Sequence, residues 1–210
     1  SSTKTAPTNV TATMQTDGKV VIEWQKIEET SEVVTDDFER YTPWATDDFG
    51  EWTSVYGEKG VARGPFSRSY PHPNEGKRFA FTLVEPASWL TDKVMEEYTC
   101  LRPHSGGRYL ASFYSVENSQ FIVADNWLIS PSLPGKQQEV TFWANNFKSS
   151  TLNYPENIEL LYSKAGTTIA DFIPTSTKVI VDCGVWKQYS ATLPEGATYF
   201  AIHNNTADTY

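Results

Sequence analysis

The sequence has little of the chemistry that usually holds metals or redox centres. It contains two cysteines, Cys100 and Cys183, in 210 residues, with no Cys-x-x-Cys pair. Its three histidines do not stand at the spacing of zinc ligands. The pattern therefore argues against a zinc site. It leaves open whether the two cysteines form a disulfide or remain free thiols, because a sequence cannot show that two distant cysteines meet.

Long apolar runs and an excess of positive charge are also missing. No apolar run approaches the roughly 20 residues that a membrane-spanning helix needs. Acidic residues outnumber basic ones by 26 to 17, which gives a net charge of −9. This balance argues against nucleic acid and against an anionic membrane surface as partners. The first residues form no apolar signal-peptide core, so we expect any export signal to have been removed or to lie upstream.

Short runs of alternating apolar residues dominate the rest of the chain. They are rich in β-branched and aromatic side chains and are bounded by Pro, Gly, Asn or Asp, as strands are. We expect strands within residues 79–83, 139–145, 157–163, 178–182 and 198–204. Helix is expected only at 89–98 and for one turn at 167–172, each after a plausible Ser or Thr cap. The pattern predicts an all-β fold, an antiparallel β-sandwich or jelly roll.

The first thirty residues differ from the rest of the chain. Residues 6–25 read as two strands joined at Asp17-Gly18, a strong hairpin signal, and they resemble the first two strands of a fibronectin type III module. An acidic, hydroxyl-rich stretch comes next. We therefore predict a partial fibronectin type III-like hairpin over 1–27, a linker over 28–35 and a jelly roll over 36–210.

Five segments, in order, carry a resemblance to a known family. They include an opening Phe-Glu strand, a His/Ser-Gly turn and an Asp-Asn-aromatic-Leu-Ile-Ser motif. The segments are 36–55, 104–113, 124–133, 162–172 and 193–205. Together they resemble the cleaved-adhesin, or choice-of-anchor J, domain family of Bacteroidetes surface proteins, which includes the haemagglutinin/adhesin domains attached to gingipain proteases.

The resemblance implies a MAM-like or galactose-binding-like jelly roll in a secreted or cell-surface protein. The expected role is a non-catalytic module that binds glycans or glycoproteins beside neighbouring domains of a larger chain. The alternatives are a carbohydrate-active enzyme, an accessory domain of a secreted hydrolase or protease, and a purely structural spacer. No array of carboxylates on one strand face supports a hydrolase. Relatives end in a further strand that this sequence lacks after Tyr210, so we expect the jelly roll to lack its final strand.

Residues 103–112, PHSGGRYLAS, raise a separate question. His104 and Ser105 could be a base and a nucleophile, the glycine pair could form a nest of amides for an anion, or the stretch could be structural. Catalysis would need a third group that orients His104 and an oxyanion hole, and neither is visible. In the family this stretch is a tight turn before a core strand. We therefore expect Gly106 and Gly107 to form a turn that needs positive φ.

The resemblance also implies a structural calcium ion. Carried over by position, Glu39 of the Phe-Glu motif is the best candidate ligand, with Asp37 beside it. Asp125 and Asn126 are expected to bond local amides at a strand entry, with a cation or a sugar as the further hypothesis. The loop at 55–60, VYGEKG, departs from the Asp-rich loop of relatives and weakens the calcium expectation.

Tryptophans are the candidate sugar platforms, because a sugar usually stacks on one exposed aromatic ring among polar groups. Those in loop-like contexts are the better candidates: Trp44, Trp52, Trp89 and Trp186. Those in alternating runs are expected in the core or half-buried: Trp24, Trp127 and Trp143.

Overall fold

The computed structural model describes residues 8–14, 20–25, 33–151 and 153–207. The chain divides into two compact units, residues 1–36 and residues 37–210. Each unit is described by itself. Within the described residues, no helix is long and apolar enough to cross a membrane.

The first unit is a two-stranded hairpin. Strand β1 (Thr8–Met14) pairs antiparallel with β2 (Val20–Gln25), and the register shifts by a bulge between Thr8 and Thr11. The two predicted strands are therefore present. The predicted turn at Asp17-Gly18 lies outside the described residues, and the fibronectin-type resemblance stays a prediction.

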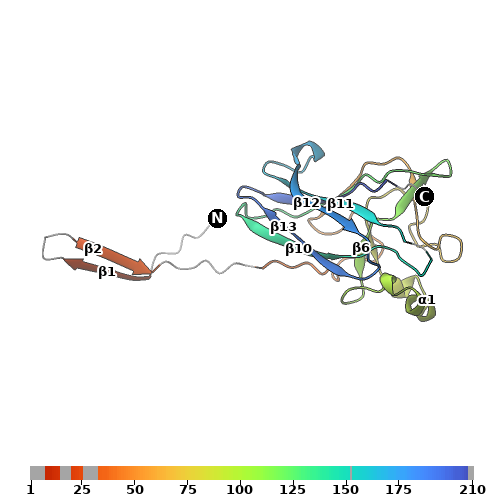
Figure 1. Cartoon of the computed structure of the whole chain (residues 1–210), viewed down its shortest axis with the longest axis horizontal. Coiled ribbons are helices and arrows are strands. Elements are labelled where there is room, and N and C mark those ends of the chain that lie inside the picture. The colour runs from red at the N-terminus through yellow and green to blue at the C-terminus, as the bar shows by residue number, and fades with distance from the viewer. Residues whose placement is uncertain (1–7, 15–19, 26–32, 152, 208–210) are drawn as a thin grey trace. The chain divides into compact units, whose positions relative to one another are not determined.

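The second unit is built from antiparallel strands (Figure 1). Its largest sheet has five strands in the order β12 (Ile173–Val181), β11 (Glu156–Ser163), β14 (Tyr199–Asn204), β9 (Asn126–Ile129) and β3 (Thr53–Tyr56). Three smaller groups complete the unit. They are β10 (Gln138–Ala144) with β13 (Lys187–Leu193), β5 (Thr82–Val84) with β6 (Tyr109–Ala111), and β4 (Val61–Arg63) with β7 (Tyr114–Glu117) and β8 (Gln120–Phe121). The all-β antiparallel prediction is confirmed.

Helix is as scarce as the sequence predicts. In the described residues the one α-helix is α1 (Asp92–Glu97), which lies inside the predicted range 89–98. Thr91 caps it, because its hydroxyl accepts a hydrogen bond from the amide of Val94. The predicted turn near residue 170 is a 3-10 turn, η3 (Ile169–Asp171). Two further 3-10 turns are η1 (Pro86–Ser88) and η2 (Thr99–Leu101).

The core lies on both faces of the five-stranded sheet. All four residues of β9 are buried, because successive side chains point to opposite faces and both faces are covered. Leu128 packs into one cluster with Phe49 and Leu83, whereas Trp127 and Ile129 belong to another. Leu128 therefore faces the opposite side of the sheet from Trp127 and Ile129.

Strand β10 has one covered face and one exposed face. Val140, Phe142 and Ala144 are partly buried, and the residues between them are exposed. Trp143 falls on the exposed face and is 44% exposed. Of the two expected places, the core or a half-buried position, the core is wrong, because the same alternation that turns Phe142 inward turns Trp143 outward. The side chain of Trp24 lies outside the described part of the chain.

Both cysteines are free. The thiol of Cys100 is buried and donates to the carbonyl of Lys148 at 3.3 Å, and the thiol of Cys183 lies 2.9 Å from the carbonyl of Val185. Burial raises the pKa of the Cys100 thiol. Of the two alternatives that the sequence left open, the structure has free thiols.

Candidate functional site

The turn before β6 is a nest of backbone amides, and the anion that it binds belongs to this chain. Gly106 has φ of +60°, which a glycine adopts without strain. The amides of Gly107 and Arg108 both donate to Oε1 of Glu39, at 2.9 and 3.0 Å. The Gly-Gly stretch is therefore a structural turn that anchors the opening Phe-Glu segment of the domain.

Arg108 reinforces this anchor from the side chain. Its Nε and Nη2 donate to Oε1 of Glu85 at 3.1 and 3.0 Å, and its Nη1 donates to the carbonyl of Tyr41 at 2.8 Å. Nη1 also donates to the carbonyl of Glu39. One guanidinium thus joins three segments of the chain, and this holds the residues on both sides of the turn in a fixed position.

His104 is part of an aromatic cluster. Its ring stacks on Trp143 with centroids 4.1 Å apart and an interplanar angle of 21°. Trp186 meets His104 edge-on at 6.1 Å, and Tyr109 packs against Trp186 at 5.8 Å. His104, Trp143 and Trp186 are named the aromatic platform below, because His104 and Trp143 are exposed.

The platform is held in place at its edge. The indole nitrogen of Trp186 donates to the carbonyl of Arg102 at 2.8 Å, which ties the loop after β12 to the turn before β6. Arg102 in turn donates from Nε to the carbonyl of Met95, at 2.9 Å, in α1. The platform therefore borders α1 through Arg102.

A shallow hollow adjoins the platform on this side. It has a volume of about 320 Å³ and is lined by Asp92, Met95, Glu96, Arg102 and Pro103. Two of these residues connect the hollow to the platform. Pro103 precedes His104 in the chain, and the carbonyl of Arg102 accepts the hydrogen bond from the indole of Trp186. An exposed aromatic surface thus lies beside two carboxylates and one guanidinium, which are strong hydrogen-bonding groups.

Comparison with protein families decides the class of the domain. The family model of the cleaved adhesin domain matches residues 85–210, which is more than half of the chain and contains the whole platform. The chain belongs to the cleaved adhesin domain family. It is therefore an adhesin-type module, as the resemblance predicted. A search of curated proteins gives no match.

Solved cleaved adhesin domains have the same fold. The K2 domain of Lys-gingipain is 20% identical with a TM-score of 0.53, and the match covers 83% of this chain and 90% of that one. The K1 domain from Porphyromonas gingivalis W83 is 14% identical with a TM-score of 0.51, and covers 82% and 87%. The K3 domain from the same organism is 18% identical with a TM-score of 0.51, and covers 84% and 91%. At these identities the likeness establishes the β-sandwich fold.

The four predicted platform tryptophans of this cleaved adhesin domain have different surroundings. Trp186 belongs to the aromatic platform. Trp52 packs between Phe38 and Phe200, with centroids 5.4 and 5.8 Å away. Its partly buried ring packs against the core cluster of Leu83 and Leu128.

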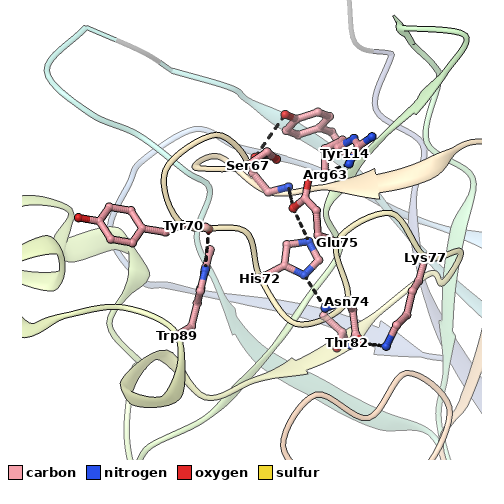
Figure 2. A network of polar contacts seen from close by, with 11 residues as sticks. Arg63, Ser67, Tyr70, His72, Asn74, Glu75, Lys77, Thr82, Trp89 and Tyr114 are labelled. Atoms are coloured by element: carbon pink, nitrogen blue, oxygen red, sulfur yellow. Dashed lines mark hydrogen bonds and ion pairs between the residues drawn. The ribbon is translucent and has the colours of Figure 1, made fainter.

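Trp44 and Trp89 lie together around the buried imidazole of His72. Trp44 stacks parallel to His72 at 6.1 Å, and Trp89 meets Trp44 edge-on at 5.9 Å. The indole nitrogen of Trp89 donates to the carbonyl of Tyr70 at 2.8 Å (Figure 2). Both indoles are half-buried, so they support a loop more than they offer a surface.

Two of the predicted calcium ligands lie at the amide nest. Oδ1 of Asp37 accepts from the amide of Glu39 at 3.1 Å, and Oε1 of Glu39 accepts from the turn of Gly107. Glu39 thus has an amide partner where a calcium ion was expected. Among the described residues, no group of three or more His, Cys, Asp or Glu side chains could hold a metal ion.

The other two predicted ligands bond to side chains rather than to local amides, which corrects that expectation. Oδ1 of Asp125 accepts from the indole of Trp127 at 2.8 Å and lies 2.9 Å from Nε2 of His203. Nδ2 of Asn126 donates to Oε1 of Glu58 at 3.2 Å and to Oγ of Ser112 at 3.1 Å. Calcium binding stays a prediction.

Sequence reasoning missed three residues of this site: His104 as an aromatic contact, Trp143 and Arg102. The alternation of β10 held the signal for Trp143, because an aromatic residue out of phase with Val140, Phe142 and Ala144 must face away from the core. No sequence signal links positions 104, 143 and 186, which only the fold brings together.

Proposed function

We propose that this cleaved adhesin domain is a non-catalytic adhesion module, secreted or on a cell surface, that binds glycans or glycoproteins through the aromatic platform. The observation that carries the proposal is the stack of His104 on Trp143, which leaves the indole 44% exposed. An isolated exposed aromatic residue is common, but a stacked pair is a larger and more rigid apolar surface. The apolar face of a pyranose ring fits such a surface.

The hollow beside the platform supplies the polar half of the recognition. Ligand sites combine aromatic surface with a few polar groups that fix orientation. Asp92 and Glu96 accept hydrogen bonds from sugar hydroxyls, and the guanidinium of Arg102 donates them. Because both kinds of partner are present, a neutral sugar satisfies the site without a charge of its own.

The alternative function, a carbohydrate-active enzyme, rests on Asp92 and Glu96. These carboxylates stand at i and i+4 of α1 and both line the hollow. Glycoside hydrolysis needs one carboxylic acid with a raised pKa on the opposite side of the scissile bond from a second carboxylate. Both side chains are exposed on one short helix, so the arrangement favours binding over hydrolysis.

Binding of the whole chain to a glycan array tests the proposal. Trp143→Ala is expected to lower the apparent affinity for the bound glycans about fivefold, because it removes an aromatic contact of about 1 kcal/mol. Trp143→Phe should retain most of the affinity.

Phe121→Ala on β8 is the matched control, because Phe121 is 49% exposed and lies on a different strand. The proposal fails if Trp143→Ala binds as the wild type does, or if the wild type binds no glycan. Release of free sugar from the bound glycans, lost in Asp92→Asn, would instead establish the enzyme.

A further inference from the structure

A second hollow lies against α1. It has a volume of about 310 Å³ and is named the Tyr70 groove. Its lining residues are Phe66, Ser69, Tyr70, Thr91, Lys93, Val94, Glu97 and Tyr98. Three of them are aromatic, and Tyr70 is 39% exposed. The rings of Phe66 and Tyr98 pack edge-to-face at 4.8 Å, and Tyr70 meets Phe66 edge-on at 6.4 Å.

The loop that carries Phe66 and Tyr70 is fixed by a buried polar network (Figure 2). His72 lies inside it with a fully buried side chain. Nδ1 of His72 accepts from the amide of Asn74 at 3.2 Å, and Nε2 faces Oε2 of Glu75 at 3.4 Å. The same oxygen of Glu75 accepts from the amide of Gly64 at 3.2 Å, so the two ends of the loop are joined.

Further bonds tie the network to the core. Nδ2 of Asn74 donates to the carbonyl of Trp44 at 2.7 Å and to Oγ1 of Thr82 at 2.9 Å. The indole nitrogen of Trp89 donates to the backbone carbonyl of Tyr70, which fixes the backbone there. The ring of Tyr70 projects away from the network in Figure 2. The groove is therefore formed before any ligand binds, and binding does not have to order the loop.

The polar lining decides which class of ligand fits. Lys93 and Glu97 both line the groove, and the hydroxyls of Ser69 and Thr91 stand beside them. A cationic ligand would meet Lys93 and an anionic one would meet Glu97. A carbohydrate uses both groups, because each of its hydroxyls donates and accepts hydrogen bonds, and its apolar face packs on the aromatic rings.

Helix α1 separates the Tyr70 groove from the platform. Asp92, Met95 and Glu96 line the hollow beside the platform, whereas Lys93, Val94 and Glu97 line the groove. An α-helix with its side chains is about 10–12 Å across, which exceeds the reach of a single sugar.

We propose that the Tyr70 groove is a second carbohydrate subsite, and that one oligosaccharide crosses α1 to occupy both subsites. This inference rests on the proposed function of the platform. Engagement of the second subsite is then intramolecular, so affinity rises with oligosaccharide length once the chain spans α1.

The test uses a glycan array that carries each oligosaccharide as a length series, from monosaccharide upward. Tyr70→Ala is expected to lower binding of the long members about tenfold and to leave the short members unchanged. Trp143→Ala is expected to lower binding of both. Tyr70→Phe keeps the ring and should behave as the wild type, and Phe121→Ala is again the control. Circular dichroism and the melting temperature check that each variant is folded.

The outcomes separate the two proposals. If Tyr70→Ala matches the wild type at every length while Trp143→Ala loses binding, the subsite is wrong and the platform stands. If Tyr70→Ala weakens binding of short and long members equally, one oligosaccharide does not span the two subsites and the inference is wrong. If the wild type binds no member of any series, the proposed function fails and the inference fails with it.

Discussion

At Gly106 the backbone φ is +60°, and a Cβ built there would lie 2.3 Å from Oε1 of Glu39. At Gly107, one residue further, the nearest atom of Glu39 is 3.8 Å away, which is ordinary van der Waals contact. We expect Gly106→Ala to lower the free energy of unfolding by about 1–3 kcal/mol, through backbone strain and displacement of the Glu39 carboxylate. Gly107→Ala should change it by less than about 0.5 kcal/mol. Urea denaturation measures both, and equal losses would contradict the amide nest.

His72 predicts how stability depends on pH. Burial lowers the pKa of its imidazole, which outweighs the opposing effect of Glu75, so the ring is neutral in the folded protein. The unfolded chain takes up a proton near pH 6.5, above the folded pKa. The contribution of His72 is therefore fully present above about pH 6.5 and is lost as the pH falls through that value towards the folded pKa.

The measurement is the free energy of unfolding between about pH 7 and pH 5. His72→Phe places a ring that does not titrate beside Phe113, so its stability should fall less steeply with pH than that of the wild type. If the free energy of unfolding of His72→Phe falls with pH as steeply as that of the wild type, groups other than His72 cause the acid sensitivity.

Asn146, just after β10, acts at the scale of elements. It is 4% exposed, and its Oδ1 accepts from the amides of Cys183 and Gly184 at 2.8 and 2.9 Å. Its Nδ2 donates to the carbonyl of Tyr154 at 2.9 Å. One side chain thus joins the segment after β10 to the connection between β12 and β13, which carries Trp186.

Asn146→Ala is expected to lower the free energy of unfolding by about 2–4 kcal/mol, because it leaves several buried polar groups without partners. Asn145→Ala is the matched control. The Asn145 side chain makes one hydrogen bond, from Nδ2 to the carbonyl of Cys100 at 2.8 Å. Asn145→Ala should therefore lower the free energy of unfolding by only about 1 kcal/mol. Denaturant unfolding followed by tryptophan fluorescence measures both variants. Similar losses would show that Asn146 does not brace these elements.

The elements themselves were largely predictable from the sequence. Strands β10, β11 and β14 coincide with alternating apolar runs, and α1 begins after a Thr cap, so local physics determines them. The pairing of the strands was not predictable, because β14 lies between β11 and β9, which are not its neighbours in the sequence. Strand β13 was not among the predicted strands. Pairing depends on contacts between distant segments, which no local pattern encodes.

The candidate site was less predictable than the fold for the same reason. The contact of Glu39 with Gly107 spans 68 residues, and the platform combines positions 104, 143 and 186. The loop position of Trp186 is predictable because Asp182 and Gly184 interrupt the strand pattern just before it. A core position for Trp143 is wrong because aromatic character alone does not place a strand residue in the core. The phase of the alternation decides its face.

In the second unit as a whole, the sheets support the proposed binding residues, which come mostly from its connections. His104, Trp186 and Tyr70 lie between elements, and Trp143 alone lies on a strand. Such an arrangement lets binding surfaces vary while the sandwich stays the same.

Strands β1 and β2 form the hairpin of the first unit. In the hairpin, Val10 and Ile22 are 57% and 56% exposed. A two-stranded hairpin is marginal by itself in water. We therefore expect the hairpin either to dock on residues 37–210 or to pair with a second chain.

Deletion of residues 1–30 tests this expectation, with the melting temperature and the solution mass by light scattering as the two measurements. A docked hairpin predicts a lower melting temperature, because its loss uncovers apolar surface. A paired hairpin predicts a fall in mass to that of one chain. The double variant Val10→Thr and Ile22→Thr keeps β-branched residues in both strands but reduces their apolar surface, so it should shift the same measurement in the same direction. An unchanged melting temperature with an unchanged mass in the deletion would contradict both forms of the expectation.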